Sequence, residues 1–360
     1  MSIQREKTIN KKSKDPDKLI YQVDDIKGKA HKTWYRGEHC NFNPNISNLK
    51  QKNAIYNYII KGWEPKIKFI NKKTKIAAFG SCFAREIAKY LTIKGFDFLA
   101  PGIDNDSILS KNQILDFKAG VNNTFALKQL FNWILNNISF EEELWHDQNK
   151  KAIQKSEQIR SATLNEFKKT DVFIITLGLS EVWYNKKTGG VFWRAVPTDN
   201  YDPKLHCFKV ASFLENKENI QFIYNSIKKI NKDAKVIFTI SPVPLVATFR
   251  PISCISANSV SKSLLRAAID EFYREISDPM KEGLYYWPSY EMVKDLFPYT
   301  YKGSPYKKDN RHIKDDCIAQ IMKNFELFYV EESSDLVKNK STKFNFKTTF
   351  KPLAKIIRKK

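Results

Sequence analysis

Cysteine is scarce in this sequence, and the patterns in which cysteine builds structure are missing. The 360 residues contain five cysteines, an odd number: Cys40, Cys82, Cys207, Cys254 and Cys317. There is no CxxC pair and no Cys/His cluster with the spacing of metal ligands. Disulfide frameworks and zinc sites depend on such patterns. We therefore expect no disulfide framework, no metal site and no cofactor.

Long apolar stretches are also missing. No run approaches the roughly 20 apolar residues of a membrane-spanning helix. The charged start of the chain, MSIQREKTINKKSKDPDK, has no apolar core of a signal peptide. We therefore expect a soluble protein in a reducing, cytoplasmic compartment. The end of the chain, FKPLAKIIRKK (350–360), leaves a second interpretation open, in which a weak amphipathic anchor places the protein at a membrane surface.

Acidic residues are few compared with basic ones. The chain has 39 Asp and Glu against 61 Lys and Arg, a formal net charge of +22. Such a charge favours anionic partners such as nucleic acid, a membrane surface or an acidic glycan. The abundance of Lys, Asn and Ile is equally typical of an AT-rich coding sequence, so a merely basic surface stays open. With 42% hydrophobic residues, the chain can build a sizeable packed core.

Three regions differ in composition: residues 1–62 read as a basic arm and irregular extension, 63–330 as one domain, and 331–360 as a basic tail. Within the domain, apolar runs predict five strands at 75–79, 96–100, 171–178, 234–244 and 284–288. Helical spacing predicts helices at 84–93, 124–138, 156–168, 209–231, 259–277 and 314–328, with Ser259 as an N-cap. This alternation predicts an α/β fold whose parallel sheet is covered on both faces. An aromatic-rich excursion at 185–207 interrupts it.

Ser81 follows the first predicted strand, within the stretch AAFGSCFARE (77–86). Sites in open α/β sheets form at the carboxyl ends of the strands. At such a strand-to-helix turn, the backbone N–H of Ser81 points to where an oxyanion would form, and Gly80 permits the tight turn. A phosphate-binding turn or a plain turn would look the same at this point.

The segment DNRH (309–312) lies ahead of the last predicted helix. At this spacing the Asp309 carboxylate can fold back onto the Nδ1–H of His312, which leaves Nε2 free as a general base. The four other histidines lack an acid at this spacing in such a loop: His31, His39, His146 and His206. An isolated Asp-x-x-His also occurs in surface turns, so it is the combination with Ser81 that suggests chemistry.

At this point the chain resembles the GSCFA family, through GSCFA (80–84), TLGLSEVW (176–183), SPVPLVATF (241–249), NSVSKSLLRAA (258–268), PSYEM (288–292) and DNRH (309–312), in this order. The family is similar to the SGNH-hydrolase (GDSL-like) superfamily of esterases and acyl hydrolases. The resemblance implies a flavodoxin-like, three-layer α/β/α fold with a five-stranded parallel sheet. It also implies Ser81 as nucleophile, His312 as base and Asp309 as the acid that orients it.

One block departs from the superfamily pattern. Where those hydrolases have Gly-x-Asn-Asp, whose Asn donates to the oxyanion, this chain has Gly-Leu-Ser-Glu at 178–181. The remaining candidate donors are the N–H groups of Ser81 and Gly120 and the side chains of Ser180 and Asn122, or of the adjacent Asn123. Loss of one such donor costs about 2.7–4 kcal/mol of transition-state stabilisation. A slow hydrolase is therefore one possible outcome.

Cys82 is the alternative nucleophile, because a thiolate is stabilised at a helix N-terminus. Consecutive residues at a turn point in different directions, so Ser81 and Cys82 cannot both face one base. The resemblance assigns the role to Ser81, and we expect Cys82 to pack inward as a small apolar residue.

Further candidates have two interpretations each. Glu181 either orients the site or is a buried carboxylate paired with a cation. Arg194 and Arg250 either bind an anionic substrate or form surface ion pairs. Three aromatic residues either stack on sugar rings or pack in the core: Trp183, Trp193 and Tyr201. The residues predicted to bind substrate are Gly178, Glu181, Trp183 and Arg194.

The residues and the resemblance together predict an ester hydrolase or O-acyltransferase that acts on O-acyl groups, in particular O-acetyl groups, of a carbohydrate. The alternative is a non-catalytic protein of the same fold that binds an anionic glycan, a membrane or nucleic acid through its basic ends. Nucleic acid is the weaker of these partners, because no recognised nucleic-acid-binding motif is present.

Overall fold

The computed structural model describes residues 18–23, 26–31, 41, 43–99, 121–140, 144–145, 155–193 and 195–331. At its centre is a parallel sheet with the strand order β3-β4-β7-β8. These strands are β3 (Ile76–Gly80), β4 (Val172–Leu177), β7 (Lys235–Ile240) and β8 (Leu284–Tyr286). All their residues are buried except Lys235, which explains why they read as apolar runs rather than alternating patterns.

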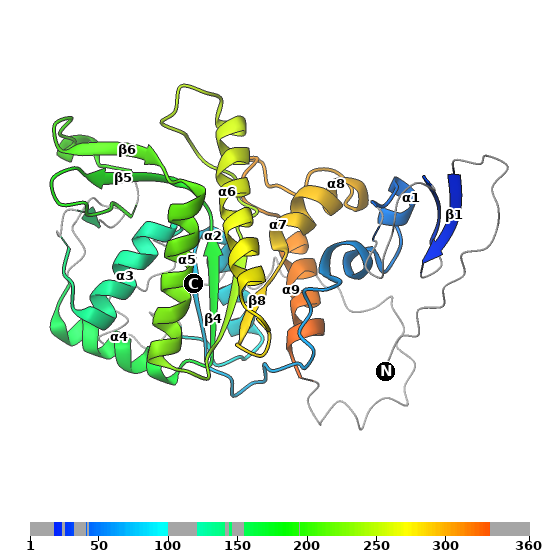
Figure 1. Ribbon diagram of the computed structural model, residues 1–360, viewed down its shortest axis with the longest axis horizontal. Helices are drawn as coiled ribbons and strands as arrows, with labels where there is room; N and C mark the ends of the chain where they lie inside the picture. Colours follow the sequence, from blue (N-terminus) through cyan, green and yellow to red (C-terminus); the bar gives the residue numbers. More distant parts are fainter. Residues whose placement is uncertain are drawn as a thin grey trace, which may run out of the picture.

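Helices cover both faces of the sheet, so the fold has three layers (Figure 1). One face carries α3 (Thr124–Asn136), α4 (Glu157–Lys169), α5 (Phe213–Ile230) and α6 (Cys254–Glu275). The other carries α2 (Cys82–Ile93) and α9 (Asp315–Tyr329). Successive strand residues alternate between the two cores: Phe79 joins the first and Ala78 the second. This period of two is what a strand imposes.

The predicted five-stranded sheet is wrong, because in the described part of the chain the sheet has four parallel strands. The segment expected as the second strand contributes one bridge, between Ile76 and Phe98, on the edge of β3 that faces away from β4. There the Ile76 N–H donates to the Asp97 carbonyl at 2.9 Å, and the Leu99 N–H donates to the Ile76 carbonyl at 2.8 Å. The next donor in this ladder would be residue 101, a proline without an N–H.

Helix and strand ends depart from prediction where a cap or a proline decides them. The expected N-cap Ser259 is wrong: α6 begins at Cys254, and Ser253 caps it by accepting from the Ser256 N–H. Helix α5 begins only at Phe213, after a capping box between Ser212 and Glu215. Strand β7 ends at Ile240 because two prolines follow within four residues.

The excursion forms a loop between two antiparallel strands, β5 (Glu181–Asn185) and β6 (His206–Val210). It also holds a short 3-10 turn, η3 (Thr198–Asn200). Figure 1 shows β5 and β6 above α3 and α5 at one end of the molecule. They follow directly from β4, so this hairpin lies at the carboxyl edge of the sheet.

The opposite end of the molecule is built from the N-terminal extension. It contains a hairpin of β1 (Lys18–Val23) and β2 (Ile26–His31), then α1 (Ile46–Leu49) and a π-helical turn, η1 (Tyr56–Ile60). The extension packs on α8 (Phe297–Thr300), which follows α7 (Ser289–Glu291) and η4 (Met292–Leu296). The suggested anchor at 350–360 lies outside the described residues. No helix in the part of the chain described here is long and apolar enough to span a membrane.

Candidate active site

A glycine brings β3 close to β4 where the candidate nucleophile begins. Gly80 has φ +121°, and a Cβ added there would lie 1.9 Å from the Thr176 carbonyl oxygen. The same carbonyl accepts the N–H of Ser81 at 3.2 Å. Only glycine fits this backbone, so the turn that places Ser81 at the carboxyl edge of the sheet is fixed by residue 80.

The Ser81 hydroxyl is the N-cap of α2 and is already hydrogen-bonded. Its oxygen accepts the Phe83 N–H at 3.1 Å, and its proton is donated to the Ser241 hydroxyl oxygen at 2.8 Å. Ser81 is 5% exposed, and Ser241, which follows β7, is fully buried. In this structure Ser241, and not His312, is the hydrogen-bond acceptor of the candidate nucleophile.

Asp309 and His312 form the pair that their spacing suggested. One carboxylate oxygen of Asp309 is hydrogen-bonded to His312 Nδ1, and the other accepts the N–H groups of Arg311 and His312 at 3.1 and 3.0 Å. These bonds, the one from His312 foremost, hold the pKa of Asp309 well below its usual range. The carboxylate therefore stays ionised and keeps the imidazole oriented, with Nε2 directed away from it.

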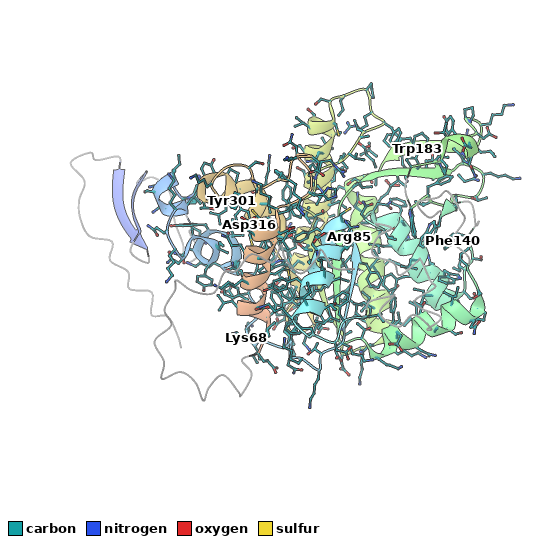
Figure 2. The ribbon with its side chains drawn as sticks, turned by 180° about the vertical axis from the view of Figure 1, so that it is seen from behind. Lys68, Arg85, Phe140, Trp183, Tyr301 and Asp316 are labelled. Carbon is teal, nitrogen blue, oxygen red and sulfur yellow. The ribbon has the colours of Figure 1, made fainter. Side chains whose placement is uncertain are left out.

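A pocket of about 210 Å³ joins this loop to the start of α2. Its apolar lining is Phe83, Val243, Ile313 and Ile318, and its polar lining is Cys82, Arg85, Glu86, Lys307 and His312. Figure 2 shows Arg85 on α2, near the middle of the molecule. The His312 imidazole and the first turn of α2 thus line the same cavity.

The expectation that Cys82 packs inward is wrong. Its side chain is half-buried and lines the same pocket as His312, whereas Ser81 is not among the lining residues. Ser81 is the cap and Cys82 the first helical residue, so the two side chains leave the turn in different directions. In this structure it is the serine that faces inward.

Asn122 supports the loop after β4. Its carbonyl oxygen accepts the N–H groups of Gly178 and Leu179, at 2.7 and 3.3 Å. A Cβ on Gly178 would lie 3.2 Å from the Asn122 Cβ, so the asparagine side chain packs directly against this glycine. No hydrogen bond joins the Asn122 amide to another described residue, which leaves its donors available.

Ser180 is turned toward α6. Its hydroxyl donates to the Ser261 carbonyl oxygen at 3.1 Å, and its N–H donates to the Ser261 hydroxyl at 2.6 Å. Ser180 is fully buried. Its polar hydrogens therefore attach the loop to α6 in this structure, and its role toward an oxyanion stays a prediction. The other backbone candidate, Gly120, lies outside the described residues.

Glu181 begins β5 and accepts a hydrogen bond from the Thr248 hydroxyl at 2.6 Å. It is 9% exposed, and this partner is a neutral hydroxyl rather than a cation. The Thr248 hydroxyl also accepts the backbone N–H of Arg250 at 3.2 Å. Glu181 thus ties the hairpin to the loop after β7. Arg194, the other predicted anion ligand, lies outside the described residues.

The aromatic candidates separate into two groups. Trp183 lies on β5 (Figure 2) and is half-buried, and its ring centroid is 5.0 Å from that of Phe249 and 5.9 Å from that of Tyr201. Phe249 and Tyr201 are 53% and 48% exposed. Trp193, in contrast, is 1% exposed and belongs to the core. Only the first group can meet a ligand.

Ser241, Lys262 and Arg311 surround the site but were not singled out from the sequence. The signal for Ser241 was present, because it directly follows a strand as Ser81 does. Lys262 lies within a helix, where nothing in the sequence marks it as buried. Among the described residues there is no group of three His, Cys, Asp or Glu side chains that could hold a metal ion.

The sequence model of the GSCFA family matches residues 75–325. No curated protein matches the chain in sequence. Among solved structures, a carbohydrate esterase of family 3 from Talaromyces cellulolyticus has 12% identity and a TM-score of 0.35, covering 71% of this chain and 98% of its own. The periplasmic domain of a lipopolysaccharide acetyltransferase from Salmonella ser. Paratyphi A has 14% identity and a TM-score of 0.32, covering 77% and 89%. An acetyl xylan esterase from the rumen bacterium Butyrivibrio proteoclasticus has 11% identity and a TM-score of 0.32, covering 76% and 65%.

Proposed function

Because the chain belongs to the GSCFA family, with every candidate site residue inside the matched range, we propose that it is a serine-dependent ester hydrolase or O-acyltransferase. Its substrate is an O-acyl group, in particular an O-acetyl group, of a carbohydrate. The observation that carries the proposal is the pocket that the oriented imidazole of His312 shares with the first turn of α2.

In the first half of the reaction, Ser81 attacks the acyl carbonyl carbon while His312 Nε2 takes the hydroxyl proton. The Ser81 hydroxyl must first leave its acceptor Ser241, by rotation of its side chain toward the pocket. The tetrahedral intermediate then collapses, the bond from carbon to the sugar oxygen breaks, and His312 returns the proton to that oxygen. The product of this half is an acyl-serine.

In the second half, His312 takes a proton from water or from an acceptor hydroxyl, whose oxygen attacks the acyl-serine. The ester bond to Ser81 breaks, and the proton returns to the serine oxygen. Water yields a free acid and makes the protein an esterase, whereas an acceptor hydroxyl yields a new ester and makes it a transferase. The fold is compatible with both.

For the oxyanion we propose the Asn122 amide and the backbone N–H groups of Gly120 and of the first turn of α2. The Asn122 amide is favoured over the Ser180 hydroxyl because the latter donates to Ser261. The Ser81 N–H, which donates to Thr176 at 3.2 Å, would have to shift or share its hydrogen bond. These donors stabilise charge that develops only in the transition state.

For the carbohydrate we propose the exposed aromatic surface of Trp183, Tyr201 and Phe249, with Gly178, Glu181 and Arg194 as further contacts. Trp183 is joined to the site through Phe249, which lies on the loop that also carries Ser241. Aromatic faces bind the apolar faces of sugar rings while the hydroxyl groups stay hydrated.

A second candidate function is a binding protein of this fold without turnover, with an anionic glycan, membrane or nucleic acid as its partner. The observation that favours it is that both the N–H and the hydroxyl of Ser81 are engaged by other groups. In that case the net charge of +22 would account for partner recognition.

The test is turnover of p-nitrophenyl acetate, followed by an acetylated oligosaccharide, by the wild type and by Ser81→Ala, Cys82→Ala and His312→Ala. We expect turnover to fall by about a thousandfold or more in the serine and histidine variants. Cys82→Ala should stay within a few-fold of the wild type. Mass spectrometry of the acylated protein should place the acyl group on Ser81 as an ester that resists neutral hydroxylamine.

Turnover that survives Ser81→Ala but is lost in Cys82→Ala, with a hydroxylamine-sensitive thioester, would move the nucleophile to Cys82. No turnover in the wild type, together with salt-sensitive retention on heparin or anionic vesicles, would instead support the binding protein.

A further inference from the structure

Lys262 on α6 carries a buried amino group whose hydrogen bonds go to backbone carbonyl oxygens. It is 2% exposed, and no carboxylate in the described part of the chain pairs with it. Its Nζ donates to the carbonyl oxygens of Gly178 at 2.8 Å and Val243 at 3.0 Å. Burial, and to a lesser degree the nearby Arg311 charge, lower the pKa of Lys262 to about 7. A buried polar group of this kind is stable only where its N–H donors are hydrogen-bonded, and here both acceptors are backbone carbonyl oxygens.

The two carbonyls belong to different loops at the carboxyl edge of the sheet. Gly178 directly follows β4, and Val243 comes three residues after the end of β7. One side chain therefore bridges the loops that follow two adjacent strands. Ser261, the preceding residue of α6, adds two hydrogen bonds to Ser180 on the first of these loops.

On the first loop, Lys262 holds the glycine that contacts the proposed oxyanion donor, Asn122. The Gly178 N–H donates to the Asn122 carbonyl at 2.7 Å, and the Asn122 side chain packs against Gly178. Lys262 holds the carbonyl of the same glycine, so the residue is fixed from both sides. A shift of Gly178 would move the amide of Asn122 with it.

On the second loop, Lys262 holds Val243, which contacts both the acceptor of the Ser81 proton and the pocket. The Val243 N–H donates at 3.2 Å to the Ser241 hydroxyl, which is the acceptor of the Ser81 proton. The Val243 side chain lines the pocket beside His312. The next carbonyl, that of Pro244, accepts from the Arg311 guanidinium at 3.3 and 3.4 Å. The loop that carries His312 is therefore hydrogen-bonded to the same segment.

We propose that Lys262 is a positioning residue that clamps the loops after β4 and β7, and thereby fixes the Asn122 amide, Ser241 and the His312 pocket relative to Ser81. It does not touch the reacting atoms. The inference rests on the proposed function. In that function, the buried side chain of Lys262 maintains the geometry on which the acyl-transfer step depends.

The test compares Lys262→Met with Lys228→Met in the full chain. Lys228 is a matched control: it lies on α5, donates to the Ala234 carbonyl at 2.9 Å, and burial lowers its pKa as well. With p-nitrophenyl acetate we expect kcat of Lys262→Met to fall about a hundredfold, as a misplacement of about 1 Å does, with KM changed less than threefold. Lys228→Met should keep the kcat of the wild type, and Lys262→Arg, which keeps the donors, should recover part of the loss.

Hydrogen–deuterium exchange gives a readout that does not depend on turnover. We expect faster exchange in peptides covering 176–183 and 240–250 in Lys262→Met, and no change there in Lys228→Met. If Lys262→Met does not fold, Lys262→Gln, whose amide can still donate to one carbonyl, takes its place with the same readouts.

Unchanged exchange in both loops would overturn the clamp, and so would unchanged kcat in a variant whose loops exchange faster. A wild type without turnover would overturn the proposed function instead. The exchange comparison would then decide alone whether Lys262 holds the two loops.

Discussion

The serines at the strand ends and the loop of the histidine are held in different ways. Ser81, Ser180 and Ser241 are 5%, 0% and 0% exposed, and each forms a hydrogen bond to a partner at least 81 residues away in the chain. The side chains of Asp309 and His312 are 46% and 36% exposed, and their bonds stay within four consecutive residues.

This difference predicts which substitutions should affect folding and which should affect mainly the reaction. Substitutions among the buried serines and glycines disturb packing between strands, so they should change folding and activity together. Substitutions in the exposed loop remove few tertiary contacts, so they should change activity far more than stability. Variants in both regions test this contrast.

Gly80→Ala should have the largest effect. Because the added Cβ would meet the Thr176 carbonyl at 1.9 Å in a backbone with φ +121°, we expect the free energy of unfolding to fall by about 4 kcal/mol or more. Urea unfolding measures it. The control is Gly189→Ala, at φ +75° with nothing within 4 Å, which should cost only about 1–2 kcal/mol. Equal losses would mean that contact with β4 does not matter.

Asp309→Asn should lower kcat by about 10²–10⁴-fold, since the base loses the carboxylate that orients it, while the urea midpoint stays close to that of the wild type. Ester turnover and urea unfolding are measured on the same sample. Asp202→Asn is a matched control, because that carboxylate also accepts the N–H of the residue two positions on, at 2.8 Å. A large loss of stability in Asp309→Asn would remove the contrast between the two halves.

Asn122→Ala should lower kcat by about 10²–10³-fold, the loss of one oxyanion donor, and should do so more than Ser180→Ala. Ser180→Ala removes a buried hydrogen bond to α6 and should therefore lower the free energy of unfolding by about 1 kcal/mol. Steady-state kinetics and urea unfolding of both variants separate the two roles. The reverse order of kcat values would assign the donor to Ser180.

The smallest effect concerns pH. The folded-state pKa of Asp309 is depressed, mainly by the hydrogen bond from His312. Its contribution to stability is therefore fully present above the unfolded pKa of about 3.9 and is lost as the pH falls below it. Urea midpoints of the wild type and Asp309→Asn should differ by a constant amount from pH 8 to about pH 5 and converge at lower pH. A difference that widens on acidification would contradict this sign.

The sequence predicted the features that depend on near neighbours. Apolar runs located β3, β4, β7 and β8, because strands buried on both faces must be apolar throughout. The Asp-x-x-His spacing predicted the bond between Asp309 and His312, since one turn suffices to close it. Where prediction failed, as with the fifth strand and the N-cap at Ser259, a competing proline or an earlier serine decided the outcome.

Contacts between distant segments depend on tertiary packing and could not be predicted from local patterns. Ser81 and Ser241 are 160 residues apart, and their hydrogen bond depends on how β3, β4 and β7 lie side by side. The same packing turns Cys82 to the pocket and places Lys262 between two loops. Local sequence is enough to tell which residues lie at the carboxyl edge of the sheet, because a strand and the turn after it are formed by near neighbours. Which of these residues meet is set by the register of strands that local patterns do not encode.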